Sequence, residues 1–143
     1  MTTIADAKGL LGVGELSGIR VNGFSAERIA GAAPPVDSED AEQSIQVQIG
    51  QNPGLIEVRV RLELKTTAAH YQVDAASQFR FPEADDVSEE VAREFAEAVG
   101  VMSVYPYLRE IIQSSSARLS LPPITLPLLR QGEVNLNPDP SGD

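Results

Sequence analysis

The segment from Leu55 to Lys65 constrains the fold more than any other part of this sequence, because its side chains alternate strictly between apolar and polar. Consecutive side chains of a β-strand point to opposite faces, so this segment has one apolar and one charged face. The apolar face consists of Ile56, Val58, Val60, Leu62 and Leu64, and the charged face of Glu57, Arg59, Arg61, Glu63 and Lys65. The pattern predicts a strand that is buried on one side only.

Three further segments are predicted to pair with this strand. One contains Ile45, Val47 and Ile49 in alternation with glutamines, and the turn after it, Asn52-Pro53-Gly54, predicts a hairpin. In the segment 69–81, His70, Gln72, Asp74, Gln78 and Arg80 oppose the apolar side chains of Tyr71, Val73, Ala75, Phe79 and Phe81. Near the N-terminus, Ile19, Val21 and Gly23 alternate with Arg20, Asn22 and Phe24. We expect a four-stranded antiparallel sheet with one polar face.

A long helix is predicted to cover the apolar side of this sheet. It begins near residue 87, where Asp86 or Ser88 can cap it, and continues to about Arg118. Its first inward stripe consists of Val91, Phe95, Ala98 and Met102. Because Pro106 cannot donate a backbone hydrogen bond, we expect a kink or a two-part helix near Gly100 and Pro106. A helix of this length exceeds what one small domain needs, which favours contact with a second subunit.

The composition restricts the classes of function. With 143 residues, 42% of them hydrophobic, the chain is expected to be one domain. Its formal net charge of −10 disfavours binding to nucleic acid or direct insertion into an anionic membrane. It has no cysteine, no apolar run of membrane-spanning length and no signal-peptide pattern, so we expect a cytoplasmic protein. Residues 1–15 are interpreted as a mobile arm and residues 131–143 as a flexible tail.

No combination of residues indicates catalysis. The lone histidine, His70, falls on the polar face of a strand and has no carboxylate at catalytic spacing. The acidic residues between Asp85 and Glu97 lack the spacing of a calcium loop, and the serines at 114–116 have no base beside them. We therefore expect no enzyme activity, no metal site and no cofactor.

The region 104–130 is apolar in both of its halves. In the helical half, one stripe contains Val104, Leu108, Ile111 and Ile112. Pro122, Pro123 and Pro127 then exclude a regular helix, so we expect an extended apolar segment that contains Leu119, Leu121, Ile124, Leu126, Leu128 and Leu129. Two interpretations stay open: this region completes the core or a subunit interface, or it binds another polypeptide.

The helix also carries a motif that resembles the SecB family of export chaperones. In that family an aromatic residue is followed by Pro-Tyr, a variable residue, Arg and Glu, matched here by Tyr105, Pro106, Tyr107, Arg109 and Glu110. A serine-containing turn, a basic residue and a Pro-containing apolar segment follow, matched by Ser114, Ser115, Arg118, Pro122, Leu126 and Pro127. The segments 16–29 and 55–81 are similar to strands of the family. The resemblance therefore covers most of the chain and is specific in the helix.

The resemblance implies a fold, a function and site residues. The implied fold class is α+β: a four-stranded antiparallel sheet with one polar face, covered on the other by a long kinked C-terminal helix. SecB-like proteins are ATP-independent holdase chaperones that bind unfolded client proteins for Sec-dependent export, and they assemble as a dimer of dimers. The implied client-binding residues are Tyr105, Tyr107, Leu119, Leu121, Ile124, Leu126, Leu128 and Leu129. The implied subunit interface contains Tyr71, Val73, Val101, Val104, Leu108 and Ile111, and the implied contacts with the SecA motor are Glu27, Glu57 and Glu63.

Two departures from the family keep alternatives open. Gly23 and Gln72 stand where carboxylates facing SecA are expected, and residues 131–143 contain too much Gly, Pro and Asn for the family's further helix. A SecB-like chaperone of a toxin–antitoxin system is therefore an alternative to an export chaperone. A third hypothesis is an oligomeric or ligand-binding α+β domain without chaperone activity.

Overall fold

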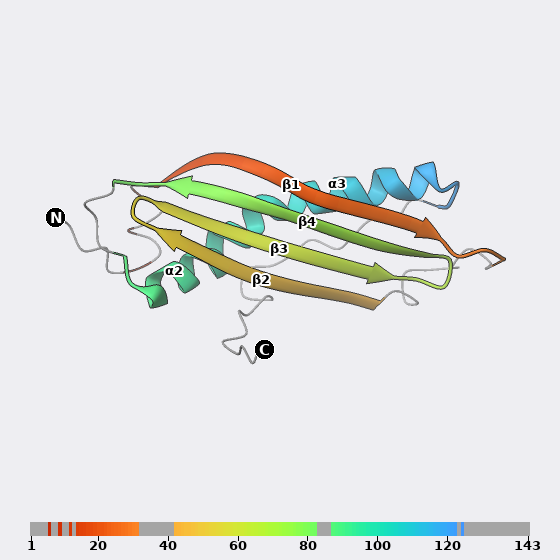
Figure 1. Cartoon of the computed structure of the whole chain (residues 1–143), viewed down its shortest axis with the longest axis horizontal. Coiled ribbons are helices and arrows are strands. Elements are labelled where there is room, and N and C mark those ends of the chain that lie inside the picture. The colour runs from red at the N-terminus through yellow and green to blue at the C-terminus, as the bar shows by residue number, and fades with distance from the viewer. Residues whose placement is uncertain are drawn as a thin grey trace.

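The computed structural model describes residues 14–31, 42–82 and 87–122, together with Asp6, Gly9, Gly12 and Ile124. Within these residues four antiparallel strands form one sheet in the order β1-β4-β3-β2 (Figure 1). The strands are β1 (Glu15–Arg28), β2 (Glu42–Asn52), β3 (Leu55–Lys65) and β4 (Ala69–Arg80). The predicted fold class, an antiparallel four-stranded sheet with a long C-terminal helix, is confirmed.

The strands differ in how regularly they pair. β2 and β3 pair without a shift from one end to the other, and so do β3 and β4. The turn between β2 and β3 contains Gly54 at a φ of 75°, a value that glycine adopts without strain. β1 pairs with β4 through two register shifts, one between Leu16 and Gly18 and one between Val21 and Gly23. Such shifts are β-bulges, which bend and twist an edge strand.

The helix over the sheet has three consecutive parts: α2 (Glu89–Phe95), a π-helical turn η2 (Ala96–Gly100) and α3 (Val101–Arg118). The hydroxyl of Ser88 caps α2 by accepting a hydrogen bond of 3.2 Å from the backbone N–H of Val91. Asp86, the other predicted cap, lies outside the described residues. The predicted interruption near Gly100 is thus a π-turn, and α3 continues through Pro106.

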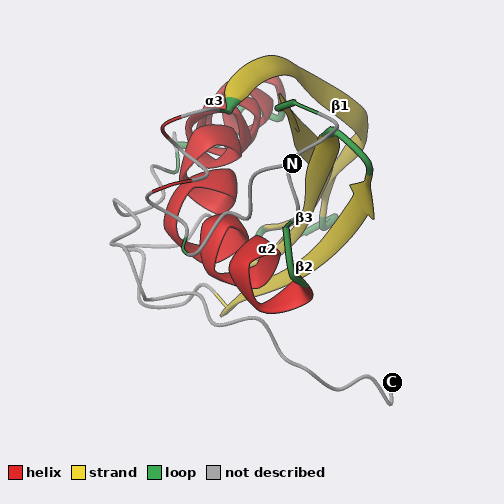
Figure 2. Cartoon of the chain, turned by 90° about the vertical axis from the view of Figure 1, so that its left-hand side faces the viewer, coloured by secondary structure: helices red, strands yellow, loops and turns green. Residues whose placement is uncertain are grey.

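This helix crosses the apolar face of the sheet diagonally (Figures 1 and 2). α2 lies beside β2, and α3 passes over β3 and β4 to reach β1. The core between them includes Ile56, Val58, Val60, Leu62, Leu64, Tyr71, Phe79, Phe95, Val101, Val104, Leu108 and Ile112. Because β3 and β4 lie in the middle of the sheet, their apolar side chains are the ones that the helix buries completely.

Gly100 sets how closely the helix approaches the sheet. A Cβ atom at this position would lie 2.4 Å from Cγ2 of Val58, closer than atoms can pack. Beside it, the buried hydroxyl of Ser77 on β4 donates a hydrogen bond of 3.1 Å to the Gly100 carbonyl. On the other side of the π-turn, the rings of Phe79 and Phe95 meet edge to face with centroids 4.8 Å apart. The helix is therefore seated on β3 and β4 at the point where it changes from α2 to α3.

The C-terminal end of α3 turns the chain back onto the core. The N–H of Leu121 donates to the carbonyl of Ser116 at 3.0 Å, and the N–H of Ser120 donates to the carbonyl of Ala117 at 3.0 Å. With the Ser120 φ of 58°, these two bonds form a Schellman motif. Leu121 is buried and belongs to the core cluster. Arg28 at the end of β1 donates to the carbonyl of Leu119 at 2.7 Å. The predicted apolar tail therefore starts as part of the domain.

The remaining predictions about the ends of the chain mostly concern residues outside the described ranges. Most of the predicted arm, residues 1–15, and all of the predicted tail, residues 131–143, lie outside the described residues. No helix within the described ranges has the length and apolar character needed to cross a membrane.

Candidate functional site

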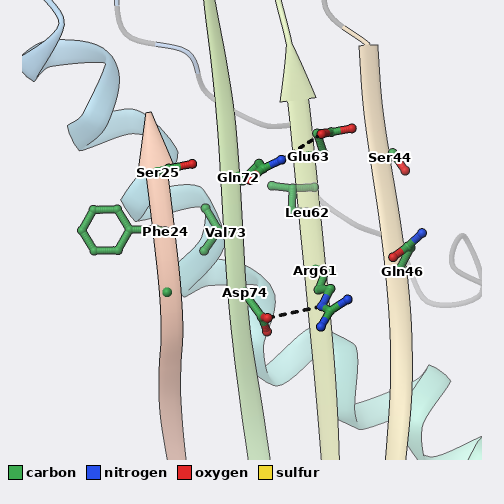
Figure 3. Close-up of a pocket in the computed structure, with 11 residues that line it drawn as sticks. Phe24, Ser25, Ser44, Gln46, Arg61, Leu62, Glu63, Gln72, Val73 and Asp74 are labelled. Carbon is green, nitrogen blue, oxygen red and sulfur yellow. Dashed lines mark hydrogen bonds and ion pairs between the residues drawn. The ribbon is translucent and has the colours of Figure 1, made fainter. Parts of the chain in front are cut away.

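The diagonal course of the helix leaves apolar side chains of β1 uncovered. Leu16 pairs with Phe79 and Phe24 pairs with Val73, and cross-strand partners share a face, so both residues lie on the helix side of the sheet. They are nevertheless 51% and 55% exposed, and Val21 on the same face is 41% exposed. In Figure 3 the ring of Phe24 extends beyond the edge of the sheet. We call Leu16, Val21 and Phe24 the β1 apolar row.

A β-bulge places Phe24 in this row. Simple alternation predicted Gly23 on the apolar face and Phe24 on the polar face. The register shift after Val21 reverses this order, because Gly23 lies opposite Asp74 and Phe24 lies opposite Val73. The sequence prediction for these two residues was therefore wrong. The available signal was a glycine within a strand, which often marks a bulge.

A second part of the apolar face is incompletely covered along β2. Ile45, Val47 and Ile49 pair with buried residues of β3 and point to the same face, but they are only partly buried. α2 reaches β2 at one end, where the Gln51 side chain donates to the Val87 carbonyl at 2.7 Å. α3 then leaves β2 and passes toward β1 (Figure 1). We call Ile45, Val47 and Ile49 the β2 apolar row.

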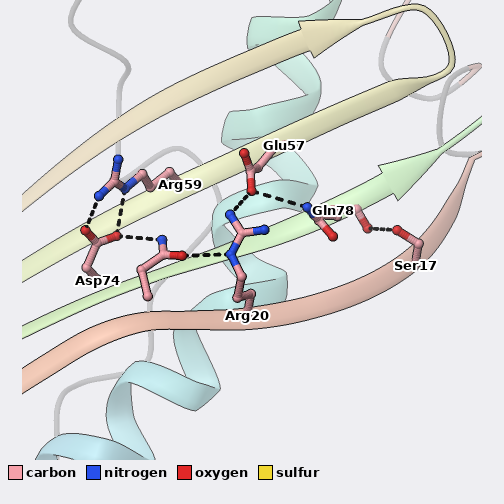
Figure 4. Close-up of polar contacts among 7 residues, drawn as sticks. Ser17, Arg20, Glu57, Arg59, Asp74 and Gln78 are labelled. Atoms are coloured by element: carbon pink, nitrogen blue, oxygen red, sulfur yellow. Dashed lines mark hydrogen bonds and ion pairs between the residues drawn. The ribbon is translucent and has the colours of Figure 1, made fainter.

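The opposite, outer face of the sheet carries a polar network centred on Asp74 (Figure 4). Nε of Arg59 donates to the Asp74 carboxylate at 2.8 Å. The side chain of Asn22, the bulge residue, donates to the same carboxylate at 3.1 Å and accepts from Nε of Arg20 at 2.7 Å. Arg20 in turn forms an ion pair with Glu57. The network joins β1, β4 and β3 across the outer face.

This network changes the pKa values of its central pair. The hydrogen bond from Arg59 holds the pKa of Asp74 well below its usual range, and Asn22 and Arg61 act in the same direction against the opposing effect of burial. The same pair raises the pKa of Arg59. Asp74 is therefore ionised throughout the neutral range, and its charge is matched by that of Arg59.

A hollow of about 550 Å³ opens on the outer face between β1 and β2 (Figure 3). Its lining is mixed, with the polar residues Ser25, Ser44, Gln46, Arg61, Glu63, Gln72 and Asp74 and the apolar residues Phe24, Leu62 and Val73. Gln72 donates to Glu63 at 3.1 Å, and the missing side chain of Gly23 leaves space on the β1 side. Such a lining can hydrogen-bond a polar group and also offers apolar contact.

The structure distributes the predicted client-binding residues over different environments. Tyr107 is 49% exposed on α3, whereas Tyr105 of the same motif is buried in the core. Leu121 is buried, and Leu119 and Ile124 pack against the core while partly exposed. The other three predicted residues lie outside the described part of the chain: Leu126, Leu128 and Leu129. Among the described members of this set, Tyr107 is the most accessible to a client.

The residues predicted at the subunit interface lie mainly inside this chain. Five of them are buried between helix and sheet: Tyr71, Val73, Val101, Val104 and Leu108. Ile111 is partly buried at the border of the same core. Packing within one chain accounts for their apolar character, and a role in subunit contact stays a prediction.

The three predicted SecA contacts share the outer side of the sheet but differ in their surroundings. Glu27 is exposed near the end of β1. Glu57 is paired with Arg20 and accepts a hydrogen bond from Gln78, and Glu63 accepts one from Gln72 and lies 3.8 Å from Lys65. Two of the three carboxylates are therefore engaged within the sheet.

The described residues contain no group of three or more His, Cys, Asp or Glu side chains able to hold a metal ion. His70 is exposed on the outer face, and the serine hydroxyls near the end of α3 bond to carbonyls of the helix itself, as Ser116 does to Ile112 at 2.9 Å. Arg109 of the helix motif has a buried Nε without a hydrogen-bond partner in the described part of the chain. Toward a partner, the apolar side of the sheet offers apolar contact through the two rows, and the edge strands offer backbone hydrogen bonds.

The fold and its uncovered apolar rows define a class of protein: a sheet-and-helix domain suited to contact with other polypeptides. No family model matches the chain. It is 37% identical over 134 residues to the SecB-like chaperone SmegB of Mycolicibacterium smegmatis, covering 94% of this chain and 88% of the relative. A shorter match of 45 residues, 42% identical, covers 32% of this chain and 25% of the SecB-like chaperone Rv1957 of Mycobacterium tuberculosis. The chain therefore belongs to the SecB-like chaperones, as the helix motif predicted.

A solved structure is similar over nearly the whole domain. It is the Mycobacterium tuberculosis Rv1957 SecB-like chaperone in complex with a ChAD peptide from the Rv1956 HigA1 antitoxin. The TM-score is 0.75 with 22% sequence identity, and the similarity covers 87% of this chain and 93% of that chain. At this identity the likeness supports the same fold.

Proposed function

We propose that this chain is a holding chaperone that binds apolar segments of incompletely folded polypeptides without ATP and without catalysis. The observation that carries the proposal is the apolar sheet face, which the chain's own helix covers only along a diagonal. Apolar contact is non-directional, so it accepts many client sequences. The net charge of −10 keeps a protein with such a surface in solution, and we place it in the cytoplasm.

We favour a client that belongs to a toxin–antitoxin system over exported preproteins. A SecB-like chaperone of the same fold was solved with a peptide from an antitoxin, which supports this kind of client. Docking to SecA would need available carboxylates on the outer face, but Glu57 is paired with Arg20, and Glu63 is bonded to Gln72. Glu27 keeps an exposed position, so export stays a second candidate. Pulldown with the intact protein distinguishes the two through recovery of an antitoxin or of SecA.

We further propose that the two apolar rows have different partners. The β1 apolar row is the more exposed, and it lies on an edge strand beside α3, so a second copy of the chain would bury it in a dimer and then in a dimer of dimers. The β2 apolar row and the chain beyond Leu121 are left for the client. Tyr107 adds an exposed aromatic contact on α3.

The chaperone proposal is tested by aggregation of a denatured enzyme on dilution into buffer, followed by light scattering. We expect an equimolar amount of assembled protein to suppress the aggregation. Tyr107→Ala should weaken the suppression, and Gln113→Ala, at another exposed position of α3, serves as the matched control. Absence of suppression by the wild-type protein would contradict the proposal.

A further inference from the structure

The two edges of the sheet are protected to different degrees. Natural sheets protect an exposed edge with bulges, lysine, proline or inward charges, because unpaired N–H and C=O groups attract other strands. β1 has two bulges, at Ser17 and Asn22. β2 has none over its 11 residues, and it contains no Lys, Arg or Pro. Its one charged residue, Glu42, is at its end.

The outer edge of β2 is also unpaired in the described structure. The strand order ends at β2, and no strand of the described ranges lies beyond it. The side chains on its outer face, such as Gln46 and Gln48, are neutral and exposed. A regular edge without a charged residue from Gln43 to Asn52 is the form that accepts an additional strand.

The β2 apolar row specifies the chemistry of such a strand. Val47 lies opposite Val60, with Ile45 and Ile49 on either side, and all three are only partly buried. A strand added at the usual spacing of about 4.8 Å would bring every second side chain next to this row, on the side of the sheet that α3 leaves open. Its other side chains would face solvent on the outer side. The edge therefore matches an extended segment in which apolar and polar residues alternate.

We propose that β2 binds an extended segment of a client polypeptide as a fifth strand, with alternate apolar side chains of the client against Ile45, Val47 and Ile49. This inference rests on the proposed chaperone function and specifies how the client is held. Backbone hydrogen bonds supply binding that does not depend on sequence, and the β2 apolar row favours client segments in which apolar and polar residues alternate. One edge can thus accept many clients.

The test uses the intact protein and a synthetic peptide of about nine residues in which valine and threonine alternate, with lysine at each end. Amide hydrogen exchange by NMR is measured with and without the peptide. We expect alternate backbone amides of β2 to become protected when the peptide is added, while those of β1 do not change. Protection on β1, on neither edge, or on β2 already before the peptide is added would overturn the proposal. The last result would mean that a second copy occupies this edge.

Two N-methylated forms of the peptide give a matched control for the backbone. In a strand, alternate N–H groups point to opposite neighbours, so methylating one set removes the hydrogen bonds to β2 and methylating the other set does not. We expect one form to bind about tenfold or more weakly by fluorescence anisotropy and the other to bind as the parent peptide does. Equal affinities of the two forms would overturn the proposal.

A pair of variants tests the side-chain contact. Val47→Thr keeps the shape of the side chain but replaces a methyl group of the β2 apolar row with a hydroxyl, and it should weaken peptide binding by roughly threefold to tenfold. Val21→Thr makes the same change in the β1 apolar row and should leave peptide binding unchanged. Loss of binding in both variants alike would overturn the assignment to β2. If the peptide does not bind but aggregation is still suppressed, this inference fails and the chaperone proposal stands; if both fail, the chaperone proposal fails as well.

Discussion

At the scale of single residues, Ser120 carries backbone strain at the end of α3. Its φ of 58° lies in the left-handed region, which costs a residue with a side chain more than it costs glycine. We expect Ser120→Gly to raise the free energy of unfolding by about 0.5–1 kcal/mol, measured by urea denaturation. Gln113→Gly, at an exposed position inside α3, should lower it by about 1 kcal/mol. Destabilisation by both changes would contradict the account of Ser120.

Asp74 connects the stability of the sheet to pH. Because the folded protein lowers the pKa of this carboxyl below its value in the unfolded chain, the pair with Arg59 stabilises the fold above about pH 4 and loses this effect as the pH falls further. Asp74→Asn should therefore lower the free energy of unfolding by about 0.5–1 kcal/mol at pH 7 and by clearly less at pH 3. Urea denaturation at the two pH values measures the difference. The same loss at both would show that charge is not the cause.

At the scale of elements, Gly100 determines the contact between helix and sheet. A methyl group at this position collides with Val58, so Gly100→Ala has to move η2 away from β3. We expect the free energy of unfolding to fall by about 1–3 kcal/mol, measured by urea denaturation. The change Gly23→Ala is the control in the sheet, since no other atom lies within 4 Å of its added Cβ.

A second substitution tests whether the collision is the cause. Val58→Ala removes Cγ2, the atom 2.4 Å from the added methyl group, together with Cγ1, and leaves only Cβ at 2.9 Å, at the cost of a small cavity. The double variant should lose less unfolding free energy than the two single variants lose together, and a double-mutant cycle measures this difference. Additive losses would assign the effect of Gly100→Ala to something other than contact with Val58.

Elements with a local cause were predictable from the sequence. The strands β2, β3 and β4 follow from alternation, and the start of α2 follows from the Ser88 cap. Alternation did not predict the place of Phe24 in the β1 apolar row, because it depends on a bulge at Asn22, and the exposure of the row depends on the angle at which a distant helix crosses the sheet. Tyr105 and Tyr107 end up buried and exposed because residues two apart on a helix point to nearly opposite sides, which the helical period alone indicates.

At the scale of the whole molecule, the domain has more apolar sheet than its helix can cover. A helix that crosses a four-stranded sheet diagonally covers the two inner strands and leaves opposite corners of the apolar face beside the edge strands. Both corners carry aliphatic side chains, and β1 adds the ring of Phe24. A single copy in water therefore keeps an exposed apolar surface that association would bury.

The proposed dimer can be tested at Phe24. The side chain is 55% exposed in the single chain, so Phe24→Asp should leave folding largely intact, with an unchanged far-UV circular dichroism spectrum. In a two-fold dimer the change occurs twice, and loss of each buried ring costs about 1.5–3 kcal/mol, so we expect the dimer dissociation constant to rise by at least about tenfold. Light scattering after size-exclusion chromatography measures the mass, with Gln113→Asp on α3 as the control. A wild-type protein that is monomeric at all concentrations would exclude the dimer and leave the β1 apolar row to the client.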